Sequence, residues 1–377
     1  MLPLQGIKVI EVAMNLAGPF CAQILAHLGA DVIKVERPGS GDDARNWGRE
    51  LTPGAGSSFN AVNLSKKGIV VDLKDQSAVE ELRRLVDQAD VFVQNLRPGT
   101  LEELGLGPEL LMQRNPRLIY CSVNAYGDAG PLRMDAGYEP IVQAFSGMMT
   151  MSGMPDGPPV RMGTQVLDHG SGMWGAIGVL AALQERHHTG RGKRVDCSLF
   201  ETAIGWWTNS YAAYAATGEL PKRHPTGSTG VVIFEGFEAI DGPMVIAAGS
   251  DSLFRTLARA IGRPEWATNP AYADNRGRVE HRLELVAEAQ KIIATRKRGE
   301  WLELLRRAGV PCAPINSLPE MLAEEQTQAS GMLQDVPELG RDVKLIGLPV
   351  RLDGERPGIR RRAPLHGEHT QEVLGRR

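Results

Sequence analysis

Asp168 is the side chain whose type and position best suit covalent chemistry in this sequence. It stands alone in the run Val-Leu-Asp-His-Gly-Ser-Gly at residues 166–172, just before a predicted helix at residues 170–184. The dipole of a helix favours the ionised form of a carboxyl group near its N-terminus. An ionised, fixed carboxylate can attack an activated acyl group and form a covalent intermediate. Aspartate also caps helices, so a purely structural role for Asp168 stays open at this point.

Further polar residues could accompany this carboxylate. Tyr138 and Glu139 open an apolar helical segment, where Glu139 is either a favourable first-turn acid or part of a pocket with Asp168. Basic residues also gather near the ends of predicted strands, where ligands bind in open α/β sheets. Together they suit a polyphosphate ligand, although ordinary surface charge is the simpler explanation for each one alone. These residues are Lys34, Arg37, Lys66, Lys67, Lys74 and Arg97.

Several other chemistries find no support in the sequence. The first strand-to-helix junction, residues 11–19, has no Gly-x-Gly-x-x-Gly, which argues against a nicotinamide or flavin cofactor. The eight histidines lack metal-ligand spacing, so no metal is expected. A net charge of −3 argues against a nucleic-acid partner. Four cysteines with apolar neighbours predict reduced thiols in a cytoplasmic protein, and neither a signal peptide nor an apolar run of membrane-spanning length is expected.

The elements that must position these residues alternate between strand and helix over the first two hundred positions. Strands are predicted at residues 7–12, 30–36, 68–73, 89–94, 118–123 and 193–199, and helices at 19–28, 77–88, 109–114, 170–184 and 201–217. This order predicts an α/β fold with a parallel, doubly wound sheet covered on both faces. A Pro/Gly/Thr-rich stretch at residues 218–230 then predicts a linker or mobile loop.

A second, smaller α+β domain is predicted beyond that stretch. Residues 231–248 suggest antiparallel strands, and residues 253–261, 278–296 and 298–308 suggest amphipathic helices. The predicted division is therefore residues 1–217 with 318–377 in a large domain, and residues 218–317 in linkers and the small domain.

Several motifs in this order resemble family III CoA-transferases, the group of formyl-CoA, carnitine-CoA and succinyl-CoA:dicarboxylate transferases. The resemblance covers essentially the whole chain. It implies two Rossmann-like large domains with small domains, threaded through each other as an interlocked, ring-like homodimer. It is carried by residues 4–12, 16–19, 28–42, 93–99, 137–140, 167–168, 188–192, 309–316 and 363–374.

The resemblance also implies a mechanism without a permanently bound cofactor, in which the CoA thioester is itself a substrate. Asp168 would attack the thioester of an acyl-CoA, with succinyl-CoA as the expected donor, to give a mixed anhydride and CoA thiolate. The thiolate would then convert the anhydride into an aspartyl-CoA thioester, and a small organic acid would reverse these steps and leave as its CoA ester.

Site residues follow from the same resemblance. The acyl pocket would include Tyr138, Glu139 and Gly227, the last in a candidate lid at residues 226–230. Leu16 stands where formyl-CoA transferases carry a glutamine, which argues against formyl and oxalate substrates. The CoA contacts would be Leu16, Ala17, Arg37, Val71, Asp72, Leu73, Lys74, Asn95, Leu96, Arg97, Asp135, Ala136 and Gly137.

Other functions remain open on sequence alone. A racemase acting on α-methylacyl-CoA would share the fold, but it needs a second acid/base group where this chain has Tyr138, and tyrosine is a poor base at neutral pH. An isomerase that moves CoA within one molecule would use the same Asp168. A CoA-binding protein without catalysis and a Rossmann oxidoreductase are further alternatives.

Overall fold

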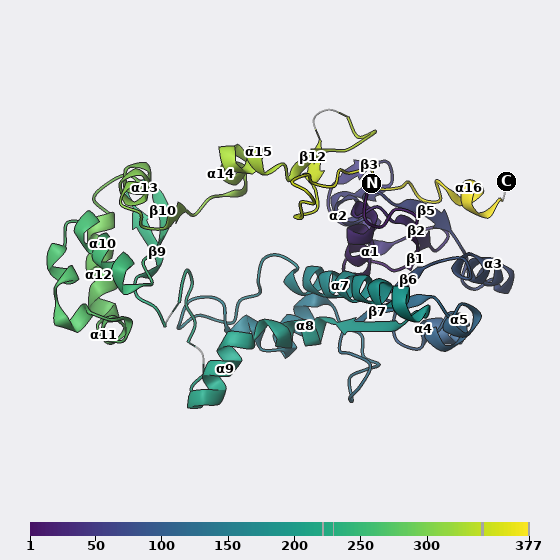
Figure 1. The fold of residues 1–377 in the computed structure, drawn as a ribbon, viewed down its shortest axis with the longest axis horizontal. Helices are drawn as coiled ribbons and strands as arrows, with labels where there is room; N and C mark the ends of the chain where they lie inside the picture. Colours follow the sequence, from purple (N-terminus) through teal and green to yellow (C-terminus); the bar gives the residue numbers. More distant parts are fainter. Residues whose placement is uncertain (221, 229, 341–342, 376–377) are drawn as a thin grey trace. The chain divides into compact units, whose positions relative to one another are not determined.

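The computed structural model describes residues 1–220, 222–228, 230–340 and 343–375, and its contacts divide the chain into two compact units (Figure 1). The first unit contains Met1–Met148, Arg161–Ala212 and Glu325–Arg377, and the second contains Met149–Val160 and Ala213–Glu324. The sequence analysis predicted the domain boundaries at residues 218 and 318, and it assigned residues 149–160 to the first domain. Those residues belong to the second unit, where Arg223 Nε donates to the Thr150 carbonyl (2.9 Å).

The first unit is built on a six-stranded parallel sheet, which confirms the predicted α/β class. Its central strands, at residues 8–12, 91–94 and 119–124, are almost fully buried on both faces, as parallel strands require, whereas the edge strand at residues 194–198 is partly exposed. The predicted strand at residues 68–73 ends at Val70 because the chain turns at Asp72, whose carboxylate accepts the Lys74 N–H (2.9 Å). In spatial order the strands are β5 (Lys67–Val70), β2 (Asp31–Glu36), β1 (Lys8–Val12), β6 (Val91–Gln94), β7 (Ile119–Asn124) and β8 (Arg194–Ser198).

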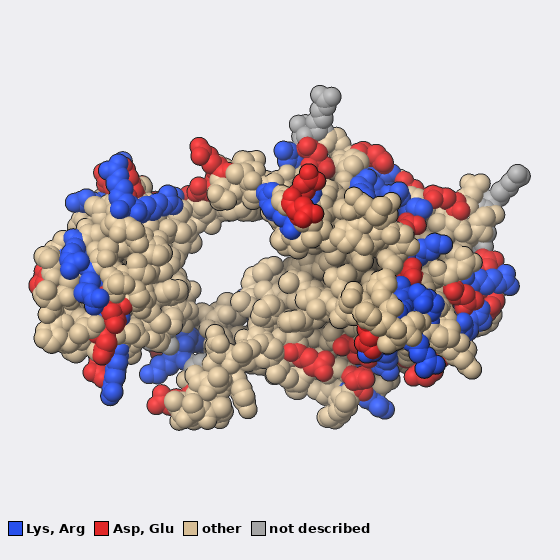
Figure 2. Space-filling view, viewed as in Figure 1, with Lys and Arg blue, Asp and Glu red and all other residues tan. Residues whose placement is uncertain are grey.

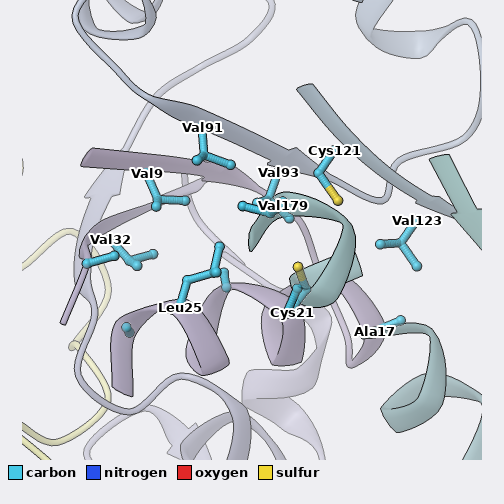
Figure 3. Packing of buried hydrophobic residues seen from close by; sticks show 14 of the residues in the cluster. Val9, Ala17, Cys21, Leu25, Val32, Val91, Val93, Cys121, Val123 and Val179 are labelled. Carbon is cyan, nitrogen blue, oxygen red and sulfur yellow. The ribbon is translucent and has the colours of Figure 1, made fainter. Parts of the chain in front are cut away.

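Helices cover both faces of this sheet. Helices α1 (Ala17–His27) and α7 (Val166–Thr189) pack on one face against Val9, Val93 and Cys121 (Figure 3). The opposite face carries α3 (Gln76–Val86), α4 (Thr100–Glu103) and α5 (Pro108–Arg114). The remaining elements of this unit are η1 (Asp43–Asn46), β3 (Glu50–Thr52), β4 (Ala55–Gly56), α2 (Ser57–Val62), α6 (Glu139–Phe145), α8 (Leu199–Trp206), α15 (Glu325–Ser330), β12 (Leu333–Asp335), β13 (Lys344–Ile346) and α16 (Thr370–Leu374).

Helix α7 is longer than predicted, beginning at Val166 and ending at Thr189. The expectation of no apolar segment long enough to span a membrane was therefore wrong, because this helix meets that length and composition. Half of its apolar window is buried inside the first unit, as in the core helix of a globular domain. Its glycines allow a close approach to α1, since a Cβ on Gly172 would lie 2.7 Å from the Ala17 carbonyl oxygen.

Gly172→Ala is expected to destabilise the first unit by about 1–3 kcal/mol, because the new methyl group would overpack against the α1 backbone. Urea unfolding at pH 7 measures the change. Gly205→Ala in α8 is the matched control, since a Cβ there meets open space. Alanine at that helical position should stabilise by about 0.5–1 kcal/mol. Equal effects of the two substitutions would contradict the close approach.

The C-terminal motif protects the edge of the sheet. His369 N–H donates to the Gly68 carbonyl (2.9 Å), and Thr370 Oγ1 accepts the Val70 N–H (3.0 Å). Both contacts fall on β5, the edge strand, whose exposed backbone groups would otherwise be free to pair with another chain. The motif at residues 363–374 thus has a structural role at this edge.

The second unit holds a three-stranded antiparallel sheet and several helices. The helices bury Phe254, Trp266 and Trp301 against the sheet. The predicted helix at residues 278–296 is broken at His281, and that at residues 201–217 at Trp207. The elements are η2 (Met148–Thr150, from Met149), α9 (Thr208–Thr217, from Ala213), β9 (Phe234–Ala239), β10 (Gly242–Ala247), α10 (Asp251–Ala260), η3 (Pro264–Ala267), η4 (Pro270–Tyr272), α11 (Asn275–Glu280), α12 (Arg282–Ile293), α13 (Arg298–Arg307), β11 (Cys312–Pro314) and α14 (Leu318–Ala323).

Candidate active site

The order of strands changes direction between β1 and β6, which makes the carboxyl ends of these two strands the expected ligand site. Asn95, just after β6, bridges this point with its side-chain amide. Its Oδ1 accepts the Met14 N–H (2.8 Å), and its Nδ2 donates to the Met14 carbonyl (2.7 Å). Asn95 therefore fixes the loop between β1 and α1, and its amide is already occupied by protein contacts.

Two neighbouring cavities open at this edge. One, of about 200 Å³, is lined mainly by apolar residues together with the charged residues Glu36, Arg37 and Asp42, and the other, of about 370 Å³, contains Asp168. Residues 12–14 line the first cavity and residues 15–17 line the second, so one short loop borders both. A long ligand could therefore lie along this loop with its two ends in different cavities.

Asp168 lies in the first turn of α7 and does not cap it, because Gln165 holds the N-cap position. The pKa of Asp168 is raised to about 7, mainly by burial and then by the negative charge of Glu139, while Arg161 opposes the rise. The sequence predicted that the helix dipole would keep this carboxyl group ionised, and this prediction was wrong because it left out the effect of burial. Burial penalises the charged form more strongly than the helix end favours it.

Glu139 is buried in the lining of the same cavity, and the side chains of Arg161 and Gln143 hold it in place. Arg161 donates to its Oε2 from Nε (3.2 Å) and Nη2 (2.9 Å). Gln143 Nε2 donates to Oε1 (2.5 Å), and Gln143 in turn accepts the Met162 N–H (3.0 Å). Both oxygens of Glu139 are therefore engaged, which suits a fixed ion pair better than a mobile base.

The structure brings together most of the predicted site residues. The cavity around Asp168 is lined by Leu16, Ala17, Asn95, Gly137, Tyr138 and Glu139, and the other by Arg37, Val71, Leu73 and Leu96. Five predicted CoA contacts lie outside both linings, on turns after β5 and β6 and before α6: Asp72, Lys74, Arg97, Asp135 and Ala136. Gly227 belongs to the second unit, where it packs on Phe234, and residue 229 of the candidate lid lies outside the described residues.

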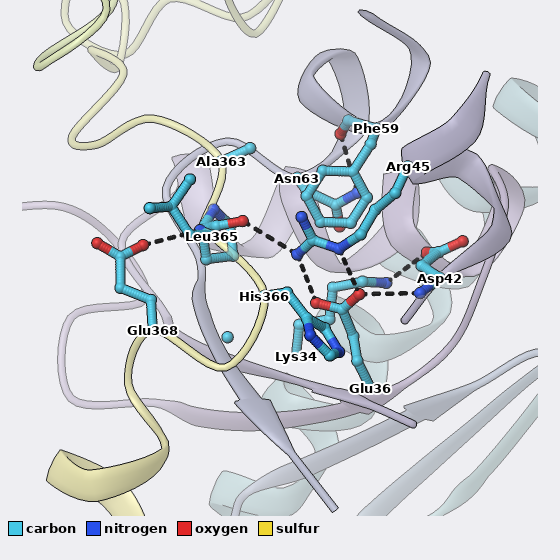
Figure 4. Close-up of polar contacts among 12 residues, drawn as sticks. Lys34, Glu36, Asp42, Arg45, Phe59, Asn63, Ala363, Leu365, His366 and Glu368 are labelled. Atoms are coloured by element: carbon cyan, nitrogen blue, oxygen red, sulfur yellow. Dashed lines mark hydrogen bonds and ion pairs between the residues drawn. The ribbon is translucent and has the colours of Figure 1, made fainter. Parts of the chain in front are cut away.

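Two of the basic residues considered for phosphate binding serve another purpose. Lys34 and Lys66 are fully buried, and both pair with Glu11 (3.0 and 2.7 Å). Lys34 also pairs with Asp42 (2.8 Å), beside the Glu36–Arg45 pair that lies over Phe59 (Figure 4). These two lysines are therefore structural. Their position near strand ends suggested phosphate binding, but that position in the sequence does not show that the side chains are buried.

Sequence reasoning missed several polar residues of the Asp168 cavity. Arg161 begins the glycine-spaced run that contains Asp168, yet nothing in the local sequence indicates its pairing with Glu139. Trp47 and Ser58 come from the segment between β2 and β5, which no predicted element covered. Asn15 lies in the loop after β1, three residues beyond Val12, and has a positive φ of 65°. Its position after a strand was the one available signal.

The fold and the cavity define an α/β enzyme with a partly buried carboxylate at the switch point of its sheet. A sequence profile described as CoA-transferase family III matches residues 4–370. The chain is 36% identical over 376 residues to a succinyl-CoA:glutarate CoA-transferase of Mus musculus, which covers 99% of this chain and 86% of that protein. It is 38% identical over 365 residues to an acetyl-CoA:oxalate CoA-transferase of Acetobacter aceti, at 94% and 92% coverage.

A solved structure gives the same result for the fold. The crystal structure of a CAIB/BAIF family protein from Brucella suis superposes with a TM-score of 0.88 at 35% identity, covering 99% of each chain. The chain therefore belongs to CoA-transferase family III, and it is a transferase that acts on CoA thioesters. The family suggested by the sequence motifs is confirmed.

Proposed function

We propose that the protein transfers CoA from succinyl-CoA to a small organic acid through covalent intermediates on Asp168. The carboxylate of Asp168 attacks the thioester carbonyl, giving a mixed anhydride and CoA thiolate. The thiolate attacks the aspartyl carbonyl, releases succinate and leaves an aspartyl-CoA thioester. The acceptor carboxylate then attacks the aspartyl carbonyl and displaces CoA thiolate, which forms a second mixed anhydride. The thiolate attacks the acceptor's carbonyl carbon in this anhydride, which yields the new acyl-CoA and releases the Asp168 carboxylate.

The observation that carries this proposal is the placement of Asp168 in a cavity beside the N-terminus of α1. Ala17 lines that cavity, and α1 has no side-chain cap, so backbone N–H groups of its first turn are available to a ligand. Such donors stabilise the oxyanion that forms when a thioester carbonyl is attacked. The thioester end of CoA would lie here, with the rest of the molecule toward the cavity lined by Arg37.

Trapping with hydroxylamine tests the covalent step. After incubation with succinyl-CoA, hydroxylamine should convert the activated carboxyl of Asp168 into a hydroxamate, which mass spectrometry detects. Trypsin cleaves after Arg161 and Arg186, so Asp168 and Glu139 fall on different peptides. Protein without succinyl-CoA is the control. A hydroxamate on the Glu139 peptide, or none with any acyl-CoA tried, would overturn the proposal.

Glu139→Gln is expected to move the pH dependence of transfer to lower pH. Because the charge of Glu139 raises the pKa of Asp168, its removal lets Asp168 ionise at lower pH. The measurement is the midpoint of kcat/KM against pH. Glu201→Gln serves as the control, since Glu201 pairs with Ser198 (2.7 Å) outside the cavity lining. An unchanged midpoint in Glu139→Gln would contradict the electrostatic coupling.

We also propose a homodimer, located in the cytoplasm. Apolar side chains on α7 and α8, namely Met173, Trp174, Ile177, Ile204 and Trp206, are 47–53% exposed. The surface over the N-terminal part of α7 lacks charged groups in Figure 2, and exposed apolar side chains in an uncharged region favour a protein interface. Light scattering should give twice the chain mass of 40.9 kDa, and a single-chain mass would exclude the dimer. The interlocked arrangement of the two chains remains a prediction.

The proposed location in the cytoplasm is supported by the four free cysteines, which suit a reducing compartment.

A further inference from the structure

Among the described residues that line the Asp168 cavity, Arg161 alone carries a positive charge. Its side chain is 37% exposed, so a ligand can reach it. Arginine presents five N–H donors in a planar fork that matches a carboxylate. The cavity therefore combines one reactive carboxylate with one accessible carboxylate-binding group.

The guanidinium of Arg161 is held at a fixed orientation. Its Nε and Nη2 both donate to Glu139 Oε2 (3.2 and 2.9 Å), and Glu139 is anchored on its other oxygen by Gln143 (2.5 Å). Within the described residues, Nη1 of Arg161 makes no hydrogen bond. A fixed guanidinium with unused donors loses little conformational freedom when it binds an anion.

The charges in the cavity favour an anionic acyl group during the reaction. In the free enzyme, Glu139 and an ionised Asp168 outweigh Arg161. Once Asp168 is acylated as an anhydride or a thioester, its charge is gone and Arg161 balances Glu139. A carboxylate at the far end of the acyl group is then repelled less by the cavity. This change comes when the acyl group must be positioned for attack by the CoA thiolate.

We propose that Arg161 binds the distal carboxylate of a dicarboxylic acyl group, with Glu139 as the residue that positions its guanidinium. This inference rests on the proposed transfer through Asp168. Donor and acceptor acyl groups are each joined to Asp168 in turn, so one arginine serves both half-reactions. The enzyme should therefore select dicarboxylic acids as donor acyl groups and as acceptors. The name of the mouse relative gives a dicarboxylic donor and acceptor, succinyl-CoA and glutarate, whereas that of the Acetobacter relative gives a dicarboxylic acceptor, oxalate, with acetyl-CoA as donor.

The test compares acids of equal chain length that differ in one terminal carboxylate. For Arg161→Gln, kcat/KM should fall about 100-fold for succinyl-CoA with glutarate, with most of the loss in KM. The value for butyryl-CoA with valerate should change less than about threefold at a pH above the midpoint of each variant. Arg161→Lys should recover part of the loss, and Arg117→Gln, which removes an exposed arginine before β7, should behave as wild type.

Two results would overturn the inference while leaving the proposed function intact. One is an equal loss for both pairs of substrates, which would mean that Arg161 acts only through the ionisation of Asp168 or through folding. The other is a wild-type enzyme that uses butyryl-CoA and valerate as well as the dicarboxylic pair. Hydroxylamine trapping with both acyl-CoA donors separates these results from a failure of the covalent mechanism, in which neither donor labels Asp168.

Discussion

Asp168→Asn is expected to lower the rate of CoA transfer by at least about 10⁴-fold. The asparagine amide has nearly the shape of the carboxyl group, but it is not a nucleophile toward a thioester, and loss of a covalent nucleophile has effects of this size. The position lies in the first turn of α7, which does not depend on it for a cap. The variant should therefore fold normally, bind acyl-CoA and yield no hydroxamate.

The pH dependence of kcat/KM in the wild-type enzyme should follow the ionisation of Asp168. Because the pKa of Asp168 is raised to about 7, kcat/KM should fall as pH drops through that value, when the nucleophile becomes protonated. Asp196→Asn is the matched control, since Asp196 is a partly buried carboxylate on β8 that pairs with Arg194 (2.8 Å).

Transfer by Asp168→Asn within about tenfold of wild type would exclude the covalent role.

Glu11→Gln should give the largest loss of stability among the substitutions considered. Glu11, Lys34 and Lys66 are all fully buried, and Glu11 pairs with both lysines. Removing one partner from a buried ion pair costs about 3–5 kcal/mol because the remaining charge has no counter-ion. The value should lie near the lower limit, since burial already lowers the pKa of Lys66 to about 8 and this lysine can lose its proton.

Urea unfolding at pH 7 measures this loss. Adding Lys66→Met to Glu11→Gln should recover part of it, because a buried apolar side chain needs no counter-ion. Glu80→Gln, which breaks exposed pairs with Arg83 and Arg114, should leave the unfolding midpoint unchanged. Equal midpoints for Glu11→Gln and wild type would mean that the buried pairs contribute nothing net.

The buried charges also affect the active site through the loop after β1. Asp42, which pairs with Lys34 (2.8 Å), accepts the N–H of Asn15 (3.0 Å). Lys34 itself donates to the Ala13 carbonyl (2.8 Å). Because residues 12–17 border both cavities, partial loss of the ion network should lower activity before it unfolds the chain.

The alternation of strands and helices, the parallel sheet and the family could all be predicted from the sequence, which also singled out Asp168 as the candidate nucleophile. These features follow from local periodicity and from motifs contiguous in the chain, which a single sequence displays. Helix α7 begins four residues before the predicted start at residue 170, so Asp168 lies in its first turn instead of capping it, an error typical where glycines weaken the helical pattern.

The chemistry of the individual groups depends on contacts that form when the chain folds. The pKa of Asp168 depends on burial and on Glu139, which lies far away in sequence, and Arg161 acquires its role from the same partner. Lys34 and Lys66 had the residue type and position of phosphate ligands, yet their burial with Glu11 makes them structural. Desolvation and charge pairing depend on distances between chain segments, and these distances exist only once the chain has folded.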